Sequence, residues 1–309
     1  MKPVNLSSGN LHAERRADYA ELMLREGDAQ AAAEIMRDAL EIAPTWVGGW
    51  FRLGEIYEKL EKIEEASAAW REALKLDPQD HAGARLKLEL IGARPIADTP
   101  PTAFVETLFD QYAARFDTAL VGKLGYQVPE LIAQAIADIA PATIFQHVLD
   151  LGCGTGLMAE HLHKRCGSID GFDLSLAMLK KAKVKGLYSK LVKADLNSID
   201  LEGHSADLVT AADVFVYVGS LDHVFAQVAV ALAPDAFFAF SVEHHQGEED
   251  FDLRPSRRYA HSPAYIKRLL AENGMKPLRI DADRLRYDRN EPVAGLIVVA
   301  TKSDKNGLA

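Results

Sequence analysis

Alternating glycines follow an acid in one short segment of the chain, Asp150-Leu151-Gly152-Cys153-Gly154-Thr155-Gly156. The apolar Val148 and Leu149 precede it and Leu157 follows it, a pattern that predicts a strand turning directly into a helix. Glycines at alternate positions let the backbone turn sharply and approach a ligand without Cβ clashes. The first turn of the helix also offers N–H groups that lack intrahelical partners. The segment therefore predicts a loop that holds a small nucleotide-like cofactor.

The spacing of the glycines and the charge of the acid narrow the choice of cofactor. A dinucleotide fingerprint requires G-x-G-x-x-G, whereas the third glycine here, Gly156, comes one residue early and Leu157 follows it. Asp150 would repel a pyrophosphate, but it would attract a cationic ammonium group. S-adenosylmethionine carries both an α-amino group and a sulfonium, so the loop favours S-adenosylmethionine over a dinucleotide.

Two further acids follow the next predicted strands. The segment 168–175 reads as a short strand with Asp173 near its end, where a carboxylate can accept hydrogen bonds from both ribose hydroxyls. The short run 190–192 precedes Asp195, which is placed to accept a hydrogen bond from the adenine amino group. A single Asp after a strand is usually a turn or cap residue. Three acids after three successive strands, the first joined to a glycine loop, favour the cofactor interpretation.

Together these motifs resemble those of the class I S-adenosylmethionine-dependent methyltransferases, over residues 102–302. The resemblance implies a doubly wound, Rossmann-like α/β sheet of seven mainly parallel strands, the last of them antiparallel. It also implies that the glycine loop holds the methionine end of the cofactor, that Asp173 holds the ribose and that Asp195 lies by the adenine. Leu174 and Leu196 would line the faces of the adenine ring. The residues predicted to bind the cofactor are Tyr112, Asp150, Gly152, Cys153, Gly154, Gly156, Asp173, Leu174, Met178, Asp195, Leu196 and Asp213.

Apolar runs and helical stretches alternate through the rest of this region. The runs 206–211, 236–242 and 294–300 are suited to strands that are buried on both faces. Helical periodicity covers 128–139 and 263–273. This alternation is typical of a doubly wound sheet with helices on both faces.

The first third of the chain carries a different pattern. The motif W-x2-L-G-x2-Y starts at Trp50 and continues at the offsets of a 34-residue tetratricopeptide repeat, with a counterpart one repeat earlier. A third helix over 81–92 lacks the full consensus and would act as a cap, and the prolines of segment 95–101 forbid a helix there. We expect an all-α repeat domain over 1–94, a linker over 95–101, a methyltransferase domain over 102–303 and a tail over 304–309.

Composition and charge restrict the setting and the partners. The 309 residues include two cysteines and carry a formal net charge of −10. Two cysteines provide no disulfide framework and no zinc site, and the negative charge counts against a nucleic-acid partner. No apolar run approaches the length of a membrane span, and the first residues lack the apolar core of a signal peptide. We expect a cytoplasmic protein.

Side chains after the fourth and fifth strands are placed to orient a methyl acceptor, and orientation supplies much of the catalysis in methyl transfer. The predicted catalytic residues are Tyr217 and His261, and the predicted substrate contacts are Tyr112, His244, Arg258, Tyr259 and His261. The segment 243–262 is long for a βα connection and rich in charges, so we expect a mobile lid whose arginines grip an acceptor carboxylate. A disordered surface loop whose charges pair with one another is the open alternative. For each histidine, a hydrogen-bonded loop position is the open alternative.

The segment 110–117, Asp-Gln-Tyr-Ala-Ala-Arg-Phe-Asp, is similar to one that lies across the cofactor in related small-molecule methyltransferases. That resemblance implies that Tyr112 helps to close the site. We expect methyl transfer to an oxygen or nitrogen atom of a small molecule. Two alternatives stay open, a protein methyltransferase whose repeats recruit the polypeptide, and a scaffold that binds the cofactor without catalysis. The repeat domain would bind a protein partner or form a homodimer through the region of Trp50 and Trp70.

Overall fold

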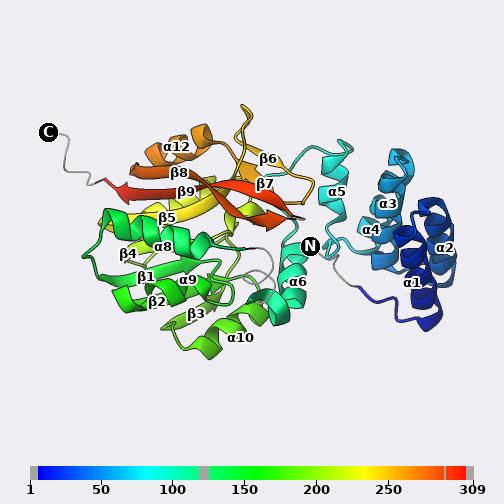
Figure 1. Cartoon of the computed structure of the whole chain (residues 1–309), viewed down its shortest axis with the longest axis horizontal. Helices are drawn as coiled ribbons and strands as arrows, with labels where there is room; N and C mark the ends of the chain where they lie inside the picture. The colour runs from blue at the N-terminus through cyan, green and yellow to red at the C-terminus, as the bar shows by residue number, and fades with distance from the viewer. Residues whose placement is uncertain (1–5, 118–124, 289, 304–309) are drawn as a thin grey trace. The chain divides into compact units, whose positions relative to one another are not determined.

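The computed structural model describes residues 6–117, 125–288 and 290–303 (Figure 1). The expected tail over 304–309 lies outside the described residues. Within the described ranges, no helix combines the length and the apolar character that a membrane span needs.

The chain falls into two units. The first unit runs to Leu108 and includes Pro255–Arg257, and the second comprises Phe109–Arg254 and continues from Arg258. The division falls inside helix α6 (Thr102–Tyr112), after the segment that the prolines mark.

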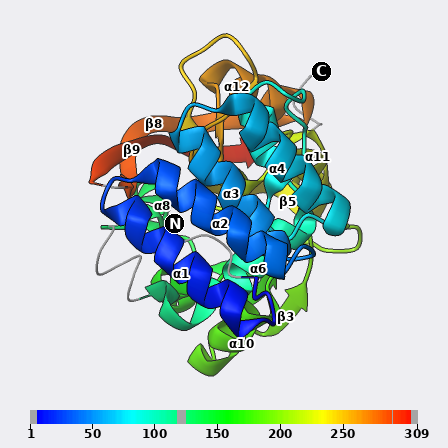
Figure 2. The ribbon, with the colours of Figure 1, turned by 90° about the vertical axis from the view of Figure 1, so that its right-hand side faces the viewer.

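The first unit contains the antiparallel helices of the predicted repeats. Figure 2 shows them side by side. Ala32, Ala39 and Ala66 are fully buried, and such small side chains let paired helices approach closely. The helices are α1 (Leu11–Arg25), α2 (Ala29–Ile42), α3 (Val47–Lys59), α4 (Ile63–Leu76) and α5 (Ala84–Leu90). The pairs α1–α2 and α3–α4 agree with the two predicted repeats.

The tryptophans of this unit are bonded internally. Trp70 is fully buried and donates from Nε1 to the Phe51 carbonyl oxygen at 3.2 Å. Trp50 is partly buried and donates from Nε1 to the Pro44 carbonyl oxygen at 2.8 Å. Trp70 is therefore core packing and is not available for the homodimer contact that the sequence suggested.

The second unit is built on a sheet whose central strands are parallel and lie in the order β3-β2-β1-β4-β5. Their bounds are β1 (Phe145–Leu151), β2 (Cys166–Asp173), β3 (Lys190–Lys193), β4 (Ala206–Ala211) and β5 (Leu232–His244). The winding reverses between β1 and β4, so the carboxyl ends of these two strands border the crevice where open α/β sheets bind ligands. β9 (Glu291–Lys302) pairs antiparallel with β5 and with β8 (Met275–Asp288), as the resemblance implied for the last strand.

Helices cover both faces of this sheet, and β1 shows why. Val148 belongs to the core that contains α8 (Val128–Ile139) and α9 (Leu157–Leu162). Its neighbour Leu149 belongs to the core that contains α11 (Asp222–Ala231) and α12 (Pro263–Glu272). Successive residues of a strand point to opposite faces, so a continuous apolar run serves both cores. The predicted doubly wound fold is confirmed.

The sheet of the described residues has nine strands rather than the seven expected. The two additional strands, β6 (Phe251–Leu253) and β7 (Tyr259–His261), pair antiparallel inside the segment 243–262. β7 also pairs in parallel with the end of β5. The prediction of a mobile lid is wrong for this part of the segment, because β7 finds backbone partners on the end of β5 and β6 finds them on β7.

Candidate functional site

Glycines shape the loop between β1 and α9. Gly152 and Gly154 have φ values of +64° and +55°, which favour glycine. A Cβ on Gly152 would lie 2.2 Å from Val214, whereas among the described residues a Cβ on Gly154 would have only Phe116 near it, at 3.9 Å. In the described part of the chain, the space beside Gly154 at the predicted cofactor loop is therefore open.

Asp150 stands at the end of β1, behind this loop. It is 1% exposed, and it accepts hydrogen bonds from Thr210 Oγ1 at 2.9 Å and from Tyr188 Oη at 2.6 Å. Burial raises the pKa of Asp150 to about 6, although both hydrogen bonds lower it. Its direct contact with a cofactor stays a prediction, because the carboxylate is almost fully buried behind the loop.

Asp173 lies at the end of β2, against the same loop. Its Oδ2 accepts from Gly154 N at 2.8 Å and its Oδ1 accepts from Ser175 N at 2.8 Å. Burial raises the pKa of Asp173 to about 6, against these two backbone hydrogen bonds. Each carboxylate oxygen keeps a second lone pair, so Asp173 can still accept from two ribose hydroxyls.

The residues predicted around the adenine follow β2 and β3 or lie in the helix between these strands. β2 pairs with β3, which places Asp195 one strand away from Asp173. Asp195 Oδ1 accepts from the backbone N and the side-chain Nδ2 of Asn197, at 2.9 and 2.8 Å. Leu196 is buried, and Met178 is fully buried in α10 (Leu176–Lys185). Leu174 is half-buried.

The aromatic segment 109–117 is fastened to the loop side of the crevice. Asp110 accepts hydrogen bonds from Ser175 Oγ and from Ala177 N, the latter at 3.2 Å. Asp117 accepts from Thr155 Oγ1 at 2.5 Å. The Tyr112 ring lies 5.6 Å from that of Phe116 in an edge arrangement. The segment therefore borders the loop, and the closing role of Tyr112 stays a prediction.

A buried charge cluster joins side chains of β5, of β8 and of the segment that follows β4. Arg286 is 1% exposed and donates to Glu243 and, at 2.5 Å, to Asp213 Oδ1. Arg258 lies 4.0 Å from Glu243 and 3.4 Å from Asp288. Burial raises the pKa of Glu243, and the two arginines lower it. Asp213 is ion-paired with Arg286, and its contact with the cofactor stays a prediction.

Tyr217 joins this cluster to the aromatic segment. Its Oη accepts from Arg258 Nε at 3.2 Å, and its ring lies 4.9 Å from that of Phe109 in an edge arrangement. Tyr217 and Arg258, which the sequence predicted separately, are thus brought together. Sequence reasoning missed Glu243, Arg286 and Asp288, and no motif around these residues marks them.

The structure places His261 and Tyr259 in the core rather than in the crevice. His261 is fully buried, and its Nε2 lies 3.0 Å from the Val218 carbonyl oxygen and 2.9 Å from that of Gly219. Burial lowers the pKa of His261 to about 4. This geometry contradicts a catalytic His261, because its ring is enclosed and bonded to backbone. Tyr259 is fully buried too, and His244 is half-buried at the end of β5.

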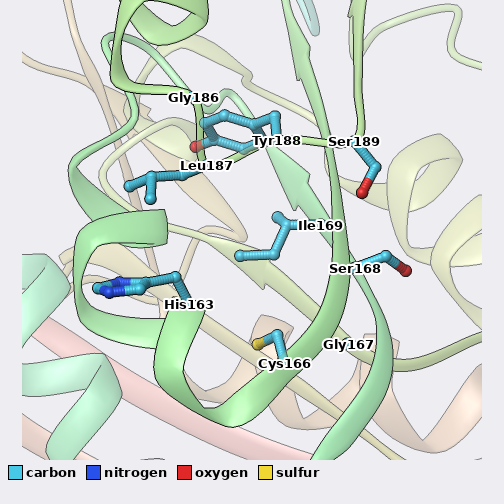
Figure 3. Close-up of a pocket in the computed structure, with 9 residues that line it drawn as sticks. All are labelled: His163, Cys166, Gly167, Ser168, Ile169, Gly186, Leu187, Tyr188 and Ser189. Atoms are coloured by element: carbon cyan, nitrogen blue, oxygen red, sulfur yellow. The ribbon is translucent and has the colours of Figure 1, made fainter.

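Figure 3 shows a cavity where β2 and β3 begin, at the ends of these strands that lie away from Asp173 and Asp195. It is lined by His163, Cys166, Gly167, Ser168, Ile169, Gly186, Leu187, Tyr188 and Ser189. Burial raises the pKa of the Cys166 thiol to about 11. Burial also holds the pKa of Cys153 in the glycine loop well above its usual range, so neither cysteine is an activated nucleophile.

Comparison with family models agrees with this geometry. Residues 148–235 match the model of a methyltransferase domain, and residues 47–80 match that of a tetratricopeptide repeat. The chain therefore contains a methyltransferase domain and, before it, a tetratricopeptide repeat. The glycine loop lies inside the first matched range, and the repeat motif that starts at Trp50 lies inside the second.

Curated relatives of this methyltransferase domain carry different printed activities. The chain is 27% identical over 222 residues to the mitochondrial arginine-hydroxylase NDUFAF5 of Mus musculus, which covers 64% of this chain and 63% of that protein. It is 29% identical over 150 residues to the malonyl-[acyl-carrier protein] O-methyltransferase of Methylovorus sp. (strain MP688), covering 45% and 49%. The chain thus spans less than two thirds of the length of these relatives.

Solved structures share the fold at low identity. The [4+2]-cyclase SpnF aligns with a TM-score of 0.54 and 16% identity, over 68% of this chain and 98% of that chain. A chain of the Haloferax volcanii Trm112 methyltransferase activator complex aligns with a TM-score of 0.51 and 19% identity, over 63% and 98%. These likenesses concern the fold, and the reaction is argued from the site.

Proposed function

We propose that this chain binds S-adenosylmethionine and transfers its methyl group to an oxygen or nitrogen atom of a small molecule. The position of Asp173 carries the proposal. Backbone N–H groups of Gly154 and Ser175 fix its carboxylate at the end of β2, beside the glycine loop. A carboxylate in this position accepts from the two hydroxyls of a ribose in open α/β sheets.

Space, charge and apolar surface in this crevice fit the cofactor. The opening beside Gly154 suits the methionine portion, and the charges of Asp150 and Asp173 favour a ligand that carries an ammonium and a sulfonium. Leu174 and Leu196 offer apolar surface to an adenine. When bound, S-adenosylmethionine supplies an electrophilic methyl group.

Tyr217 is the residue that we assign to the acceptor side. Arg258 Nε donates to the Tyr217 oxygen at 3.2 Å, which leaves the hydroxyl hydrogen to donate to an acceptor oxygen or nitrogen. Phe109 packs against the Tyr217 ring and restricts its orientation. Tyr112, half-buried in the adjoining segment, would close the site over the acceptor. These side chains would orient the acceptor, which supplies much of the rate in methyl transfer.

The contacts of Arg258 argue against the prediction that it binds an acceptor carboxylate. Glu243 and Asp288 already lie within ion-pair distance of Arg258. A carboxylate substrate would have to displace one of them. We therefore leave the acceptor class at oxygen or nitrogen nucleophiles.

The tetratricopeptide match favours a second candidate, a protein methyltransferase whose repeat unit recruits its substrate. Such repeats present surfaces for other chains, so a protein partner is proposed for the first unit in either case. A cytoplasmic location and a homodimer stay predictions of the sequence.

One experiment separates these functions. The full chain is incubated with S-adenosylmethionine labelled on its methyl group, together with either a metabolite extract or a protein extract. Label in small molecules supports the first proposal, and label in polypeptides supports the second. Binding of S-adenosylhomocysteine in calorimetry without any transfer would indicate a scaffold, and absence of binding would overturn both proposals.

A further inference from the structure

Tyr188 is tied to the acid behind the glycine loop. It follows α10 and precedes β3, and its hydroxyl donates to Asp150 Oδ2 at 2.6 Å. Thr210 Oγ1 donates to the other carboxylate oxygen at 2.9 Å. Because Asp150 is 1% exposed, these two hydroxyls stand where water would otherwise solvate the carboxylate.

The ring of Tyr188 is held closely by backbone from two elements. A Cβ on Gly156 would lie 3.0 Å from the ring, and a Cβ on Gly171 would lie 2.8 Å from it. Gly156 is the N-cap residue of α9, and Gly171 lies within β2. Tyr188 also lines the cavity of Figure 3, so one side chain reaches from that cavity to Asp150.

We propose that Tyr188 is a positioning residue for the cofactor, whose hydroxyl keeps the Asp150 carboxylate ionised and fixed behind the glycine loop. This inference rests on the proposed function. A hydrogen bond to the charged form of an acid favours that form. The charge so maintained attracts the ammonium group of the cofactor through the loop.

The surroundings of Asp150 make this hydrogen bond decisive. Burial raises the pKa of Asp150 to about 6, the charge of Asp173 raises it too, and the hydrogen bonds from Tyr188 and Thr210 lower it. Among the described residues, the other titratable groups that interact with Asp150 are Cys153, Cys166 and Tyr126. Burial raises the pKa of all three groups, so they are neutral at pH 7 and do not offset the loss of a donor.

The test compares Tyr188→Phe with the wild type, because this change removes the hydroxyl and keeps the ring. Calorimetry measures S-adenosylhomocysteine binding to the full chain from pH 5.5 to 8.5. We expect wild-type affinity to decline below about pH 6 and the midpoint of the variant to lie about one to two pH units higher. The variant should bind about two- to tenfold more weakly at pH 7 and recover to within about twofold at pH 8.5.

Tyr265→Phe is the matched control. Tyr265 donates to Asp222 at 2.7 Å, the same kind of pair away from the loop, so its profile should coincide with that of the wild type. In an Asp150→Asn background, Tyr188→Phe should produce no further shift of the midpoint.

Two results would overturn the inference while the proposed function stands. One is a Tyr188→Phe profile that coincides with the wild type. The other is equal weakening at every pH, which would show a packing role alone. Failure of the wild type to bind at any pH would overturn the proposed function itself, and the inference with it.

Discussion

Gly152 and Val214 are packed against each other so closely that a Cβ on Gly152 would lie 2.2 Å from the valine side chain. Gly152 follows β1 and Val214 follows β4, so the contact joins the two strands that border the crevice. We predict that Gly152→Ala lowers the free energy of unfolding by about 2–4 kcal/mol, from overpacking and from its φ of +64°. Urea unfolding measures the loss, and adding Val214→Ala should recover part of it.

Whereas Gly152→Ala should mainly affect stability, Gly154→Ala should mainly affect ligand binding. Its φ of +55° costs about 1–2 kcal/mol of stability, but nothing described lies closer than 3.9 Å to the added methyl group. That methyl group would occupy the proposed ligand space, so we predict that S-adenosylhomocysteine binding weakens by about tenfold or more while the protein stays folded. Wild-type affinity in this variant would place the cofactor elsewhere.

Asp173→Ala should weaken S-adenosylhomocysteine binding by about 1.5–3 kcal/mol, because ribose hydroxyls would lose a charged acceptor. This corresponds to roughly 10- to 150-fold in the dissociation constant measured by calorimetry. Asp170→Asn is the control on the same strand, where Asp170 faces His147 at 3.2 Å. Unchanged affinity in Asp173→Ala would remove the assignment of the ribose site.

His261 makes stability depend on pH. Its folded-state pKa of about 4 lies below the 6.5 of a free histidine, so the folded state excludes a proton that the unfolded state accepts. The contribution of neutral His261 to the free energy of unfolding is complete above pH 6.5 and is lost as pH falls toward 4. Between pH 7.5 and 5.0, the wild type should lose about 2 kcal/mol more unfolding free energy than His261→Gln. Parallel losses in urea unfolding would contradict the burial of this ring.

Arg258→Lys should lower turnover by about tenfold or more while cofactor affinity stays within roughly twofold, under about 0.5 kcal/mol. A lysine cannot reproduce the planar contacts of Arg258 with Tyr217 and Asp288. Arg254→Lys is the control, because Arg254 pairs with Asp252 at 3.3 Å and is more exposed. Steady-state kinetics with the acceptor found in the labelling experiment supplies the measurement.

The sequence predicted what depends on neighbouring residues. The turn after β1, the strand that ends at Asp173 and the helix over 128–139 are specified by local glycine spacing and apolar periodicity. The structure has β2 ending at Asp173 and α8 spanning Val128–Ile139. Local chemistry of this kind is readable without knowledge of the rest of the chain.

The sequence could not predict partners that lie far apart along the chain. Arg286 meets Asp213 73 residues away, and Tyr188 meets Asp150 38 residues away. His261 suggested a base by its type and position, yet the carbonyl oxygens of Val218 and Gly219 hold its ring in the core. Tertiary packing determines the roles of these residues. The sequence pattern around each of them does not predict its distant partner.

The aromatic segment 109–117 is attached through carboxylates that accept from Ser175 and Thr155, near the surface. Hydrogen bonds of this kind exchange with water more readily than a packed apolar core opens. In the proposed site the spent, demethylated cofactor would lie under this segment, so we expect its departure to require these bonds to break first. The lifetime of the attachment, rather than the methyl transfer step, would then set the upper limit on how often one molecule can complete a cycle.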